Sequence, residues 1–579
     1  MNTKYILLFI CVLSLITADT HSQLVFLNQF NGGGGGSNAS NAITADGSGN
    51  SYVTGYTTGL TSMHDITTLK YDASGRLIWA RSYNGTGNNT DEAYAITIDN
   101  SGNIYVAGST TGLLSDKDMI IIKYNNSGVQ QWAKIYSSPG IFPDEAYAIT
   151  LDASGDPIIS GYSYLEGSGN VMTIIKYDVY GNQTLFTTGS GASGSTDVAY
   201  AITVDAGDNM YVTGYEKAFL DATTNNKSIV TVKFSPAGVR QWSKTITGAG
   251  NGDNEPSSMA TDQNGNTYVT GYVTAVNGDK DYVTVKYDVN GNQVWMKTYN
   301  NSSANDDDIP RKIIIDQRGD VVVTGSSKHS HNSNTEDYLT IKYSGSSGSQ
   351  QFTHRYTEPS VNSTSIAYSL TEYKRGKYYI TGSSRQTTSA GSEDIVTLEL
   401  DKNGSYKGKF RIANPGPDAG YDIVADESGN FTLAGYLSGN ETGMSSGDMT
   451  NMSCARYNDN NSGDNSYIGI FSVVNNTENN LIALKSLETN IPKSFNLYQN
   501  YPNPFNPSTV IKFDVSQSSI VKIVIYDILG KEVLTPVNDY MNPGTYEVTV
   551  SLSNLSSEMY FYKMTSGSFT DIKKMVLVK

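Results

Sequence analysis

The sequence has few cysteines and little basic charge, and each scarcity excludes a class of protein. Of the two cysteines, Cys11 lies in an apolar run that we expect to be removed. Cys454 then stands alone, so no intrachain disulfide can form. The 40 lysines and arginines stand against 56 aspartates and glutamates, which gives a net charge of −16. Because phosphate binding needs a basic surface, we expect no nucleic-acid partner.

Long apolar runs are also scarce. One run, residues 5–16, follows Lys4 and precedes small and polar residues, which is typical of a secretory signal peptide over residues 1–22. Cleavage follows either Ala18 or Ser22. This run is too short to span a bilayer comfortably, and no later run reaches membrane-spanning length. We therefore expect no transmembrane segment once the signal is removed.

Glycine (56) and tyrosine (41) are abundant, and they favour strands joined by tight turns. A segment of the form (Tyr/Val)-Val-(Thr/Ala)-Gly recurs at intervals of 53 to 57 residues. Its eight copies end at Gly55, Gly108, Gly161, Gly214, Gly271, Gly325, Gly382 and Gly435. Before most copies stands an Asp-x-x-Gly-(Asn/Asp) turn, such as residues 99–103. Repetition at this period indicates an array of equal structural units.

Each unit contains four short strands, illustrated by residues 93–99, 103–108, 119–125 and 129–136. The third strand is apolar on both faces, so neighbouring units must cover both. Four-stranded sheets that cover one another in a ring form a β-propeller. We expect the glycine to end the second strand because the chain turns there.

The last unit is completed from the other end of the chain. The eighth copy has no fourth strand after residues 452–458, whereas "LVFLNQFNG" (24–32) reads like the fourth strand "LIWARSYNG" (77–85). The sequence therefore predicts an all-β, eight-bladed β-propeller over 23–458 that is closed by the N-terminal strand. The "D-x-x-G-N-x-Y-V-T-G" core resembles the bacterial SBBP β-propeller repeats, which implies the fold but no single activity.

The C-terminal part of the chain has a different pattern. After a linker or bridging segment over residues 459–490, residues 491–579 contain short alternating strands separated by Pro, Gly and Asn turns. This pattern predicts a small Ig-like β-sandwich. The proline cluster within 502–507 cannot pair as a central strand and is expected to form a rigid entry loop.

This segment resembles the type A C-terminal sorting domain of the type IX secretion system of Bacteroidota. The residues that carry the resemblance are Asn500, Pro502, Asn503, Pro504, Phe505, Asn506, Pro507, Tyr526, Asp527, Gly530, Gly544, Lys573 and Lys574. One departure is Glu558, where the family usually has glycine. The resemblance implies export through the periplasm by the type IX secretion machinery, to the medium or to the outer-membrane surface.

No catalytic motif is recognised in the sequence. It lacks H-E-x-x-H, G-x-S-x-G and phosphate-loop patterns. The pair His329 and His331 lies in a polar segment with no third ligand marked. The turn before Trp79 lacks the spacing of sialidase repeats. Gly75 stands four residues before Trp79, as in the repeats of quinoprotein dehydrogenases, but the mature chain lacks the two cysteines for the paired-cysteine feature often seen there. We therefore expect no enzymatic activity and no cofactor.

Recognition is the favoured function. The connections between second and third strands vary between units and are polar, and rigid scaffolds usually carry binding sites on such loops. We expect a non-catalytic binding or adhesion scaffold for a surface glycan or protein ligand. The alternatives are a secreted enzyme acting on polysaccharide or another extracellular substrate, and loops that are merely solvated connections.

Acidic residues stand before the first strand of most units. The candidates for a cation site are Asp91, Glu92, Asp144, Glu145, Asp197, Asp307 and Asp308. If these carboxylates form a crown around one mouth of the ring, they either stay solvated or bind a hard cation such as calcium through oxygen ligands. The sequence favours the solvated rim because no calcium-loop pattern is present.

Overall fold

The computed structural model describes residues 23–578 except for short internal segments. These segments are 31–36, 60–62, 114–115, 190–194, 218–225, 302–305, 330–334, 359–362, 375, 386–392, 414–416, 427–429, 439–449, 459–466, 471–481, 489–491, 518, 542–543, 553–554 and 568. The predicted signal peptide, residues 1–22, also lies outside the description. The described residues form strands and turns without a helix, which confirms the all-β prediction. They accordingly include no apolar helix of membrane-spanning length.

Within the described part of the chain, the first 32 strands can be grouped into eight sets of four, which we call units 1 to 8. A short parallel pairing of β12 with β14 joins units 3 and 4 into one eight-stranded sheet. Units 1 to 4 comprise β2 (Ala39–Ala45), β3 (Ser51–Thr58), β4 (His64–Tyr71) and β5 (Leu77–Tyr83); β6 (Glu92–Ile98), β7 (Ile104–Thr111), β8 (Lys117–Tyr124) and β9 (Gln130–Tyr136); β10 (Glu145–Leu151), β11 (Pro157–Leu165), β12 (Gly169–Tyr177) and β13 (Gln183–Thr188); and β14 (Ser195–Val204), β15 (Met210–Lys217), β16 (Ser228–Phe234) and β17 (Arg240–Ile246).

Units 5 to 8 repeat the pattern with the same antiparallel order. They comprise β18 (Glu255–Thr261), β19 (Thr267–Thr274), β20 (Lys280–Tyr287) and β21 (Gln293–Tyr299); β22 (Asp308–Ile315), β23 (Val321–Lys328), β24 (Glu336–Tyr343) and β25 (Gln350–Tyr356); β26 (Ser365–Tyr373), β27 (Lys377–Arg385), β28 (Glu393–Leu400) and β29 (Tyr406–Ala413); and β30 (Ala419–Ala425), β31 (Phe431–Ser438) and β32 (Thr450–Asn458) with β1 (Gln23–Phe30). The N-terminal strand β1 thus completes unit 8, where it pairs antiparallel with β32 from Gln23↔Asn458 to Phe30↔Met452.

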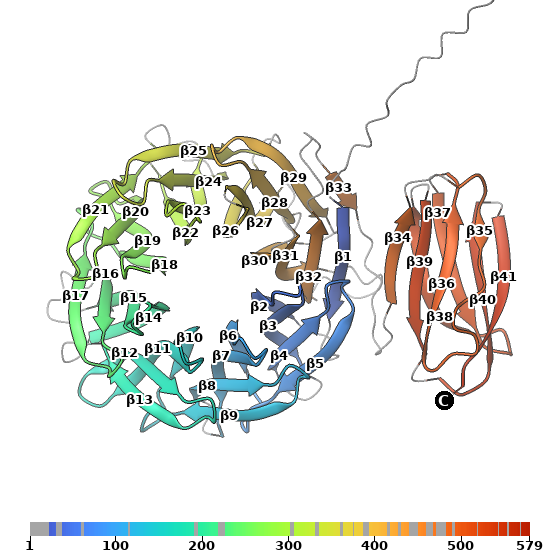
Figure 1. Cartoon of the computed structure of the whole chain (residues 1–579), viewed down its shortest axis with the longest axis horizontal. Coiled ribbons are helices and arrows are strands. Elements are labelled where there is room, and N and C mark those ends of the chain that lie inside the picture. The colour runs from blue at the N-terminus through green and yellow to red at the C-terminus, as the bar shows by residue number, and fades with distance from the viewer. Residues whose placement is uncertain are drawn as a thin grey trace, which may run out of the picture.

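Figure 1 shows the units in a ring, with the first strand of each unit on the inner side and the fourth on the outer side. The first strands of successive units contact one another, and β30 of unit 8 contacts β2 of unit 1. Buried side chains fill the junctions: Tyr52 and Ile66 of unit 1 pack in one cluster with Ile104 and Ile120 of unit 2. The repeats are therefore propeller-like, and each unit buries its apolar third strand against its neighbours.

Tight turns occupy one end of each unit, which we call the turn face. In unit 1, the amide of Gly49 donates to the carbonyl of Asp46, while Oδ1 of Asp46 accepts hydrogen bonds from the amides of Ser48 and Asn50. Gly49 has a φ of 78°, which glycine adopts without strain. This turn is the structural reason for the recurrent Asp-x-x-Gly-Asn pattern. The described residues of the other connections lie at the opposite end, which we call the loop face.

The glycine of the second strand has a different role from the one expected. It does not end the strand, because β7 continues three residues beyond Gly108 to Thr111. Instead, a β-bulge in the first strand brings a carbonyl close to it: a Cβ at Gly108 would lie 1.9 Å from the carbonyl oxygen of Glu92. A Cβ at the equivalent glycine of every unit would lie 1.8 to 2.2 Å from the corresponding carbonyl oxygen. The glycine is therefore required by close backbone approach.

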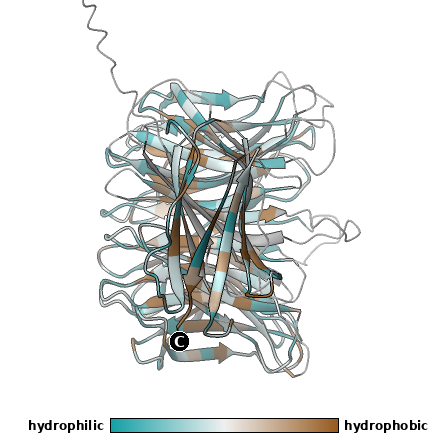
Figure 2. Cartoon of the chain, turned by 90° about the vertical axis from the view of Figure 1, so that its right-hand side faces the viewer, coloured by the Kyte–Doolittle hydropathy of each residue, from teal (hydrophilic) through white to brown (hydrophobic). Residues whose placement is uncertain are grey.

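The C-terminal segment forms two four-stranded sheets with orders β34-β39-β36-β35 and β38-β37-β40-β41. Their strands are β34 (Ile482–Glu488), β35 (Asn496–Leu497), β36 (Ser508–Val515), β37 (Ser519–Tyr526), β38 (Glu532–Met541), β39 (Gly544–Ser551), β40 (Met559–Ser566) and β41 (Phe569–Val576). Buried residues of both sheets, including Phe513, Ile523 and Tyr562, share one core. Figure 2, viewed from this side, shows hydrophobic and hydrophilic residues along these strands, as a sandwich requires.

The predicted linker, residues 459–490, contributes strands to both regions. Within it, β33 (Tyr467–Ile470) pairs parallel with β29 of unit 7. The second strand, β34, pairs antiparallel with β39 and extends one sheet of the sandwich. The sandwich therefore begins before residue 491, which was predicted as its start.

Candidate functional site

The bulge in the first strand of each unit adds one residue between two that pair with the second strand. In unit 2, for example, Ala93 is opposite Gly108 and Ala95 is opposite Ala107, so Tyr94 is the extra residue. The equivalent bulge residues are Asn41, Tyr94, Tyr147, Tyr200, Ser257, Arg311, Tyr368 and Tyr421. Bulges re-aim side chains. Here they place one side chain per unit on the inner edge of the ring, towards the loop face.

Tyrosines at the bulge positions of units 2 to 4 form a continuous aromatic arc, which we call the first arc: Tyr94, Tyr147 and Tyr200, with Tyr162 and Tyr215 from the second strands. The ring centroids of Tyr94 and Tyr147 are 5.4 Å apart, and those of Tyr147 and Tyr200 are 5.7 Å apart. Tyr162 and Tyr215 support the bulge rings at 6.1 and 5.7 Å. The bulge tyrosines are half-buried, so each residue keeps some surface accessible to solvent.

A second arc is formed by units 7 and 8. The rings of Tyr368 and Tyr421 lie 5.3 Å apart in an edge-to-face arrangement, and Tyr436 lies 5.6 Å from Tyr421. Between the arcs, units 5 and 6 carry Ser257 and the exposed Arg311 at the bulge positions. The inner edge therefore alternates between aromatic and polar sectors.

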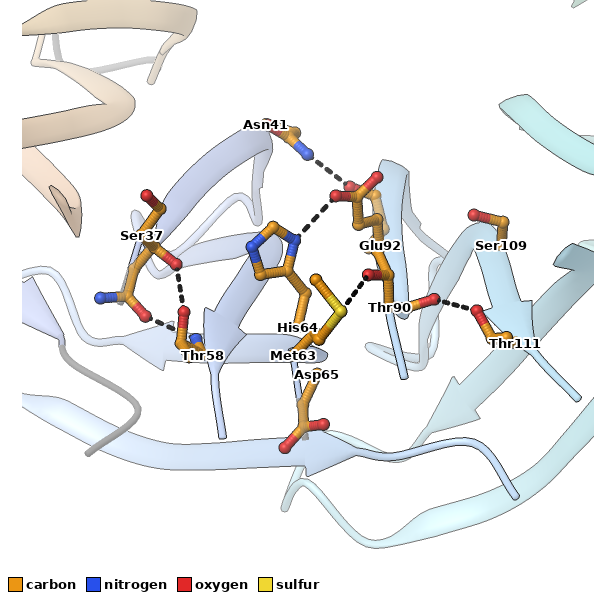
Figure 3. Close-up of polar contacts among 12 residues, drawn as sticks. Ser37, Asn41, Thr58, Met63, His64, Asp65, Thr90, Glu92, Ser109 and Thr111 are labelled. Atoms are coloured by element: carbon orange, nitrogen blue, oxygen red, sulfur yellow. Dashed lines mark hydrogen bonds and ion pairs between the residues drawn. The ribbon is translucent and has the colours of Figure 1, made fainter. Parts of the chain in front are cut away.

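Charged groups border the first arc at the junctions between units. Figure 3 shows the His64 ring directed at Glu92 across the junction of units 1 and 2, with Nδ1 of His64 2.9 Å from Oε1 of Glu92. The Tyr94 hydroxyl donates to Oε2 of Glu92 at 2.8 Å. Nζ of Lys117 lies 3.7 Å from the same oxygen. The hydrogen bond with His64 has the largest effect and lowers the pKa of Glu92, and the Tyr94 hydroxyl and the Lys117 charge lower it further. The pKa falls to about 2 although burial opposes the shift, so this carboxylate stays ionised.

The same arrangement is repeated around Glu145, at the junction of units 2 and 3. Its Oε2 lies 3.2 Å from Nζ of Lys117, and its Oε1 accepts a hydrogen bond from the Tyr162 hydroxyl at 2.9 Å. The Tyr94 hydroxyl is 3.0 Å from Oε2 of Glu145. Lys117 therefore pairs with two carboxylates, and the aromatic hydroxyls are tied into one polar network.

The predicted crown of solvated acids is wrong for four aspartates that lie just before the first strand of their unit or at its beginning. Asp91, Asp144, Asp197 and Asp308 are at most 2% exposed. Asp91 accepts hydrogen bonds from the amides of Gly85 and Thr111 and from the Thr110 hydroxyl, so it holds the connection between units instead of facing solvent. This could not be predicted from the sequence, because a buried aspartate that accepts backbone hydrogen bonds and a solvated loop aspartate have the same sequence pattern.

Asn254 occupies the equivalent position in unit 5. Its Oδ1 accepts from the amides of Gly248 and Thr274, and its Nδ2 donates to the carbonyl of Lys227. A neutral side chain therefore performs the same role. Burial raises the pKa of Asp144, and likewise that of Asp308, to about 6.

Asp307 is the predicted cation candidate that the structure brings into a group of acids. Its carboxylate, with those of Asp279 and Asp306, offers oxygens within 4.8 Å of one another. One of its oxygens also accepts a hydrogen bond from the amide of Lys280. Calcium binding stays a prediction, now confined to residues other than the buried aspartates.

The histidine pair is not assembled as a metal site by the described residues. Nδ1 of His329 lies 2.9 Å from Oδ2 of Asp337, which also accepts a hydrogen bond from Arg355 at 2.8 Å. His331 lies outside the described residues. His329 thus contacts a carboxylate that it shares with Arg355.

The motif residues of the C-terminal segment fasten its entry loop to the final strands. Asn500 donates to the Pro502 carbonyl and to the Thr509 hydroxyl, and Oδ1 of Asn503 accepts from the amide of Val576. Phe505 is buried in the sandwich core. The entry loop is therefore held by specific hydrogen bonds and by the buried Phe505 ring.

The remaining motif residues have local structural roles. Asp527 accepts hydrogen bonds from the amides of Leu529 and Lys531 in a turn where Gly530 has a φ of 80°. The Lys574 carbonyl accepts from Gln499, and Lys573 pairs with Asp571. Tyr526 ends β37 and Gly544 begins β39, whereas Pro502, Pro504 and Asn506 are exposed and Pro507 is half-buried.

Family models match parts of both the repeat region and the C-terminal sandwich. Residues 499–579 match the secretion system C-terminal sorting domain, and residues 78–115 and 241–274 match the beta-propeller repeat known as SBBP. The chain is thus an all-β protein that carries β-propeller repeats and a sorting domain. The sorting domain is that of the type IX secretion system, which implies secretion or display at the cell surface and interaction with that machinery.

Curated relatives match short parts of the chain. An uncharacterized WD repeat-containing protein of Acanthamoeba polyphaga mimivirus is 27% identical over 37% of this chain, and the regulatory protein FlaEY of Caulobacter vibrioides is 31% identical over 19%. The matches span only 14% and 12% of those two proteins. Among solved structures, a Dyadobacter fermentans protein of unknown function matches 76% of this chain and 99% of its own length at 8% identity. The polysaccharide lyase Uly1 matches 72% and 90% at 10% identity, and both TM-scores are 0.36, too low to inform function.

Sequence reasoning missed the bulge tyrosines. A signal for them was present in "DEAYAI" and "DVAYAI", where a large aromatic residue stands between two alanines at the same place in three units. The alanines pair with the second strand, and the tyrosine is the residue that the bulge leaves over. Recognising this needs the partner strand, because a one-residue offset changes which face every later residue occupies.

Proposed function

We propose that this protein is exported by type IX secretion and acts outside the cell as a non-catalytic binding scaffold. The observation that carries the proposal is the first arc, in which tyrosines of three successive units are presented on the inner edge of a rigid ring beside an ordered polar network. Aromatic rings with a few placed polar groups are the usual composition of a ligand-binding surface. The connections between second and third strands vary in sequence between units, and such loops usually carry specificity on a rigid scaffold.

We also propose that the eight units are blades of one closed propeller, with β1 as the closing strand. The pairing of β1 with β32 and the contact between β30 and β2 support this reading. A closed ring gives the binding surface a fixed geometry, so little conformational entropy is lost when a ligand binds. Removing residues 23–30 would expose the edge of β32, and exposed edges promote aggregation. An unchanged melting temperature and a monomeric elution profile of that truncated protein would contradict closure.

Export is tested by truncation after residue 470, which keeps β33 on unit 7 and removes β34 together with the rest of the sandwich. The sandwich has its own core, so we expect the truncated protein to accumulate in the periplasm. Immunoblotting of periplasmic and extracellular fractions measures this directly. Normal extracellular levels of the truncated protein would overturn the assignment of the sorting domain to export.

Binding is tested with the full chain bearing Tyr147→Ser and Tyr200→Ser. Ser257 stands naturally at the same bulge position, so the backbone accommodates serine there. The fluorescently labelled wild-type protein should be retained on immobilised extracellular polymers, and the double variant should be washed off. Equal retention of both proteins would remove the first arc as the binding surface, and release of soluble products from a polymer would identify an enzyme instead.

A further inference from the structure

We propose that the first arc binds a neutral saccharide chain. This inference rests on the proposed binding function and adds the chemical class of its ligand. A saccharide presents flat C–H faces and many hydroxyl groups, so it needs aromatic faces next to hydrogen-bonding groups. The first arc and its bordering charges supply both along three successive units.

The aromatic part of the surface is extended rather than a single ring. Tyr147 lies between Tyr94 and Tyr200, with centroid separations of 5.4 and 5.7 Å. The three rings come from corresponding positions of adjacent units, so the surface repeats with the fold. A repeating row of half-buried rings matches a polymer of similar residues better than it matches a single small molecule, because each ring can contact one residue of the chain.

The polar part of the surface favours a neutral ligand. Glu92 is paired with His64 and Lys117, and Glu145 is paired with Lys117. A charged ligand would compete with these pairs and leave one partner uncompensated, which is costly when the groups are partly buried. Sugar hydroxyls can donate to the remaining carboxylate lone pairs and accept from the ammonium group without breaking any pair.

The charge of the whole chain agrees with this selection. The net charge is −16, so an acidic polysaccharide is repelled over a distance as well as at the site. The exposed Arg311 offers a guanidinium on the inner edge, but it belongs to unit 6 and lies outside the first arc. We therefore assign the arc to uncharged polymers such as glucans, mannans or xylans.

The experiment measures binding of the full chain to immobilised β-1,3-glucan, α-mannan, β-1,4-xylan, polygalacturonate and gelatin. The wild type is compared with Tyr147→Ser/Tyr200→Ser, with Tyr147→Phe, which keeps the ring, and with Tyr368→Ser in the second arc as the matched control. Circular dichroism and elution volume verify that each variant is folded. A misfolded double variant is replaced by the single variants Tyr147→Ser and Tyr200→Ser.

The inference predicts saturable binding to at least one neutral polysaccharide, weakened at least tenfold by the serine substitutions and less than threefold by Tyr147→Phe and Tyr368→Ser. Binding to gelatin alone that the serine substitutions abolish would refute the saccharide class while keeping the binding function. A preference for polygalacturonate would also refute the neutral class. No binding to any of the five polymers would overturn the saccharide inference. Binding that is unchanged by the serine substitutions would overturn both the saccharide inference and the first arc as the binding surface.

Discussion

The two faces of the ring use repetition in opposite ways. On the turn face, most units have an aspartate that accepts amide hydrogen bonds and a glycine with positive φ, and four units have a tryptophan packed on a glycine of the next unit. On the loop face, the bulge position holds tyrosine in five units but asparagine, serine and arginine in units 1, 5 and 6.

The difference lies in what each backbone feature demands of the side chain. A tight turn requires specific chemistry, because only certain residues supply the conformation and the local hydrogen bonds. The bulge is accommodated by a glycine on the partner strand, so the bulge residue itself is under no such requirement. A propeller-like repeat can therefore change its inner edge without changing its fold. Four predictions, from the largest effect to the smallest, test this contrast.

The largest effect is expected from Gly108→Ala on the loop-face side of β7. The new Cβ would lie 1.9 Å from the Glu92 carbonyl oxygen, and two paired backbones cannot separate cheaply. We expect a loss of about 3 kcal/mol, measured as a lower midpoint of thermal unfolding. Gly47→Ala on the turn face is the control, because no atom lies within 4 Å of its Cβ position. Similar midpoints for the two variants would contradict the role assigned to the bulge carbonyl.

The next effect concerns the buried aspartates. Asp144→Ala removes the acceptor of the Ser138 amide, which is buried, and of the Tyr164 amide, which is partly buried. We expect a loss of about 2 kcal/mol at pH 5, because unsatisfied buried donors are costly. Asp144→Asn should retain most of the stability, since Asn254 already performs this role in unit 5. Equal loss in both variants would contradict the stabilising role assigned to the hydrogen bonds of this side chain.

A pH dependence follows from the same site. The pKa of Asp144 is raised by burial to about 6, above the ordinary value of 3.8, so the folded state holds this proton more tightly than the unfolded state. The associated stability is present below pH 4 and is lost as pH rises through 6.

Denaturation of wild type and Asp144→Asn at pH 4 to 7 measures this effect as a difference that cancels the other titrating groups. The variant should gain relative to wild type as pH rises, by roughly 1 to 2 kcal/mol in total. The reciprocal substitution Asn254→Asp should lose stability relative to wild type as pH rises, because it adds a buried carboxyl group at the equivalent position. A constant difference across this range would exclude the raised pKa.

The smallest effect is expected on the turn face, from Trp132→Phe. The indole Nε1 of Trp132 donates to the Val179 carbonyl of unit 3 at 3.1 Å, and its ring packs on Gly181. Phe352 packs on Gly404 in the same way, so the ring contact survives and only the hydrogen bond is lost. We expect a cost of about 1 kcal/mol in chemical denaturation. The control is Gln130→Ala at an exposed position two residues away, which should change the free energy of unfolding by no more than about 0.5 kcal/mol. An equally small effect of Trp132→Phe would contradict a stabilising role of the indole hydrogen bond between units.

Several features were predictable because they depend on neighbours in the chain. The Asp46 turn, the apolar third strands and the pairing partner of residues 24–32 follow from local spacing and from comparison of one unit with another. The sorting domain was recognised from motif residues such as Asn500 and Asn503, whose contacts lie within one small sandwich. Local hydrogen bonds and strand alternation leave a direct record in the order of residues.

Other features were decided only when separate segments met in space. The sequence alone determined that the chain is all-β, repeats at 53 to 57 residues and ends in a sorting domain. The tertiary structure decided that Gly108 lies inside a strand, that Asp91 and Asp144 are buried, and that β34 belongs to the sandwich. It also brought Tyr94, Tyr147 and Tyr200, each some fifty residues from the next, into one arc. The physical reason is that burial and side-chain direction depend on strand register, and register is a property of the pair of strands, not of either strand by itself.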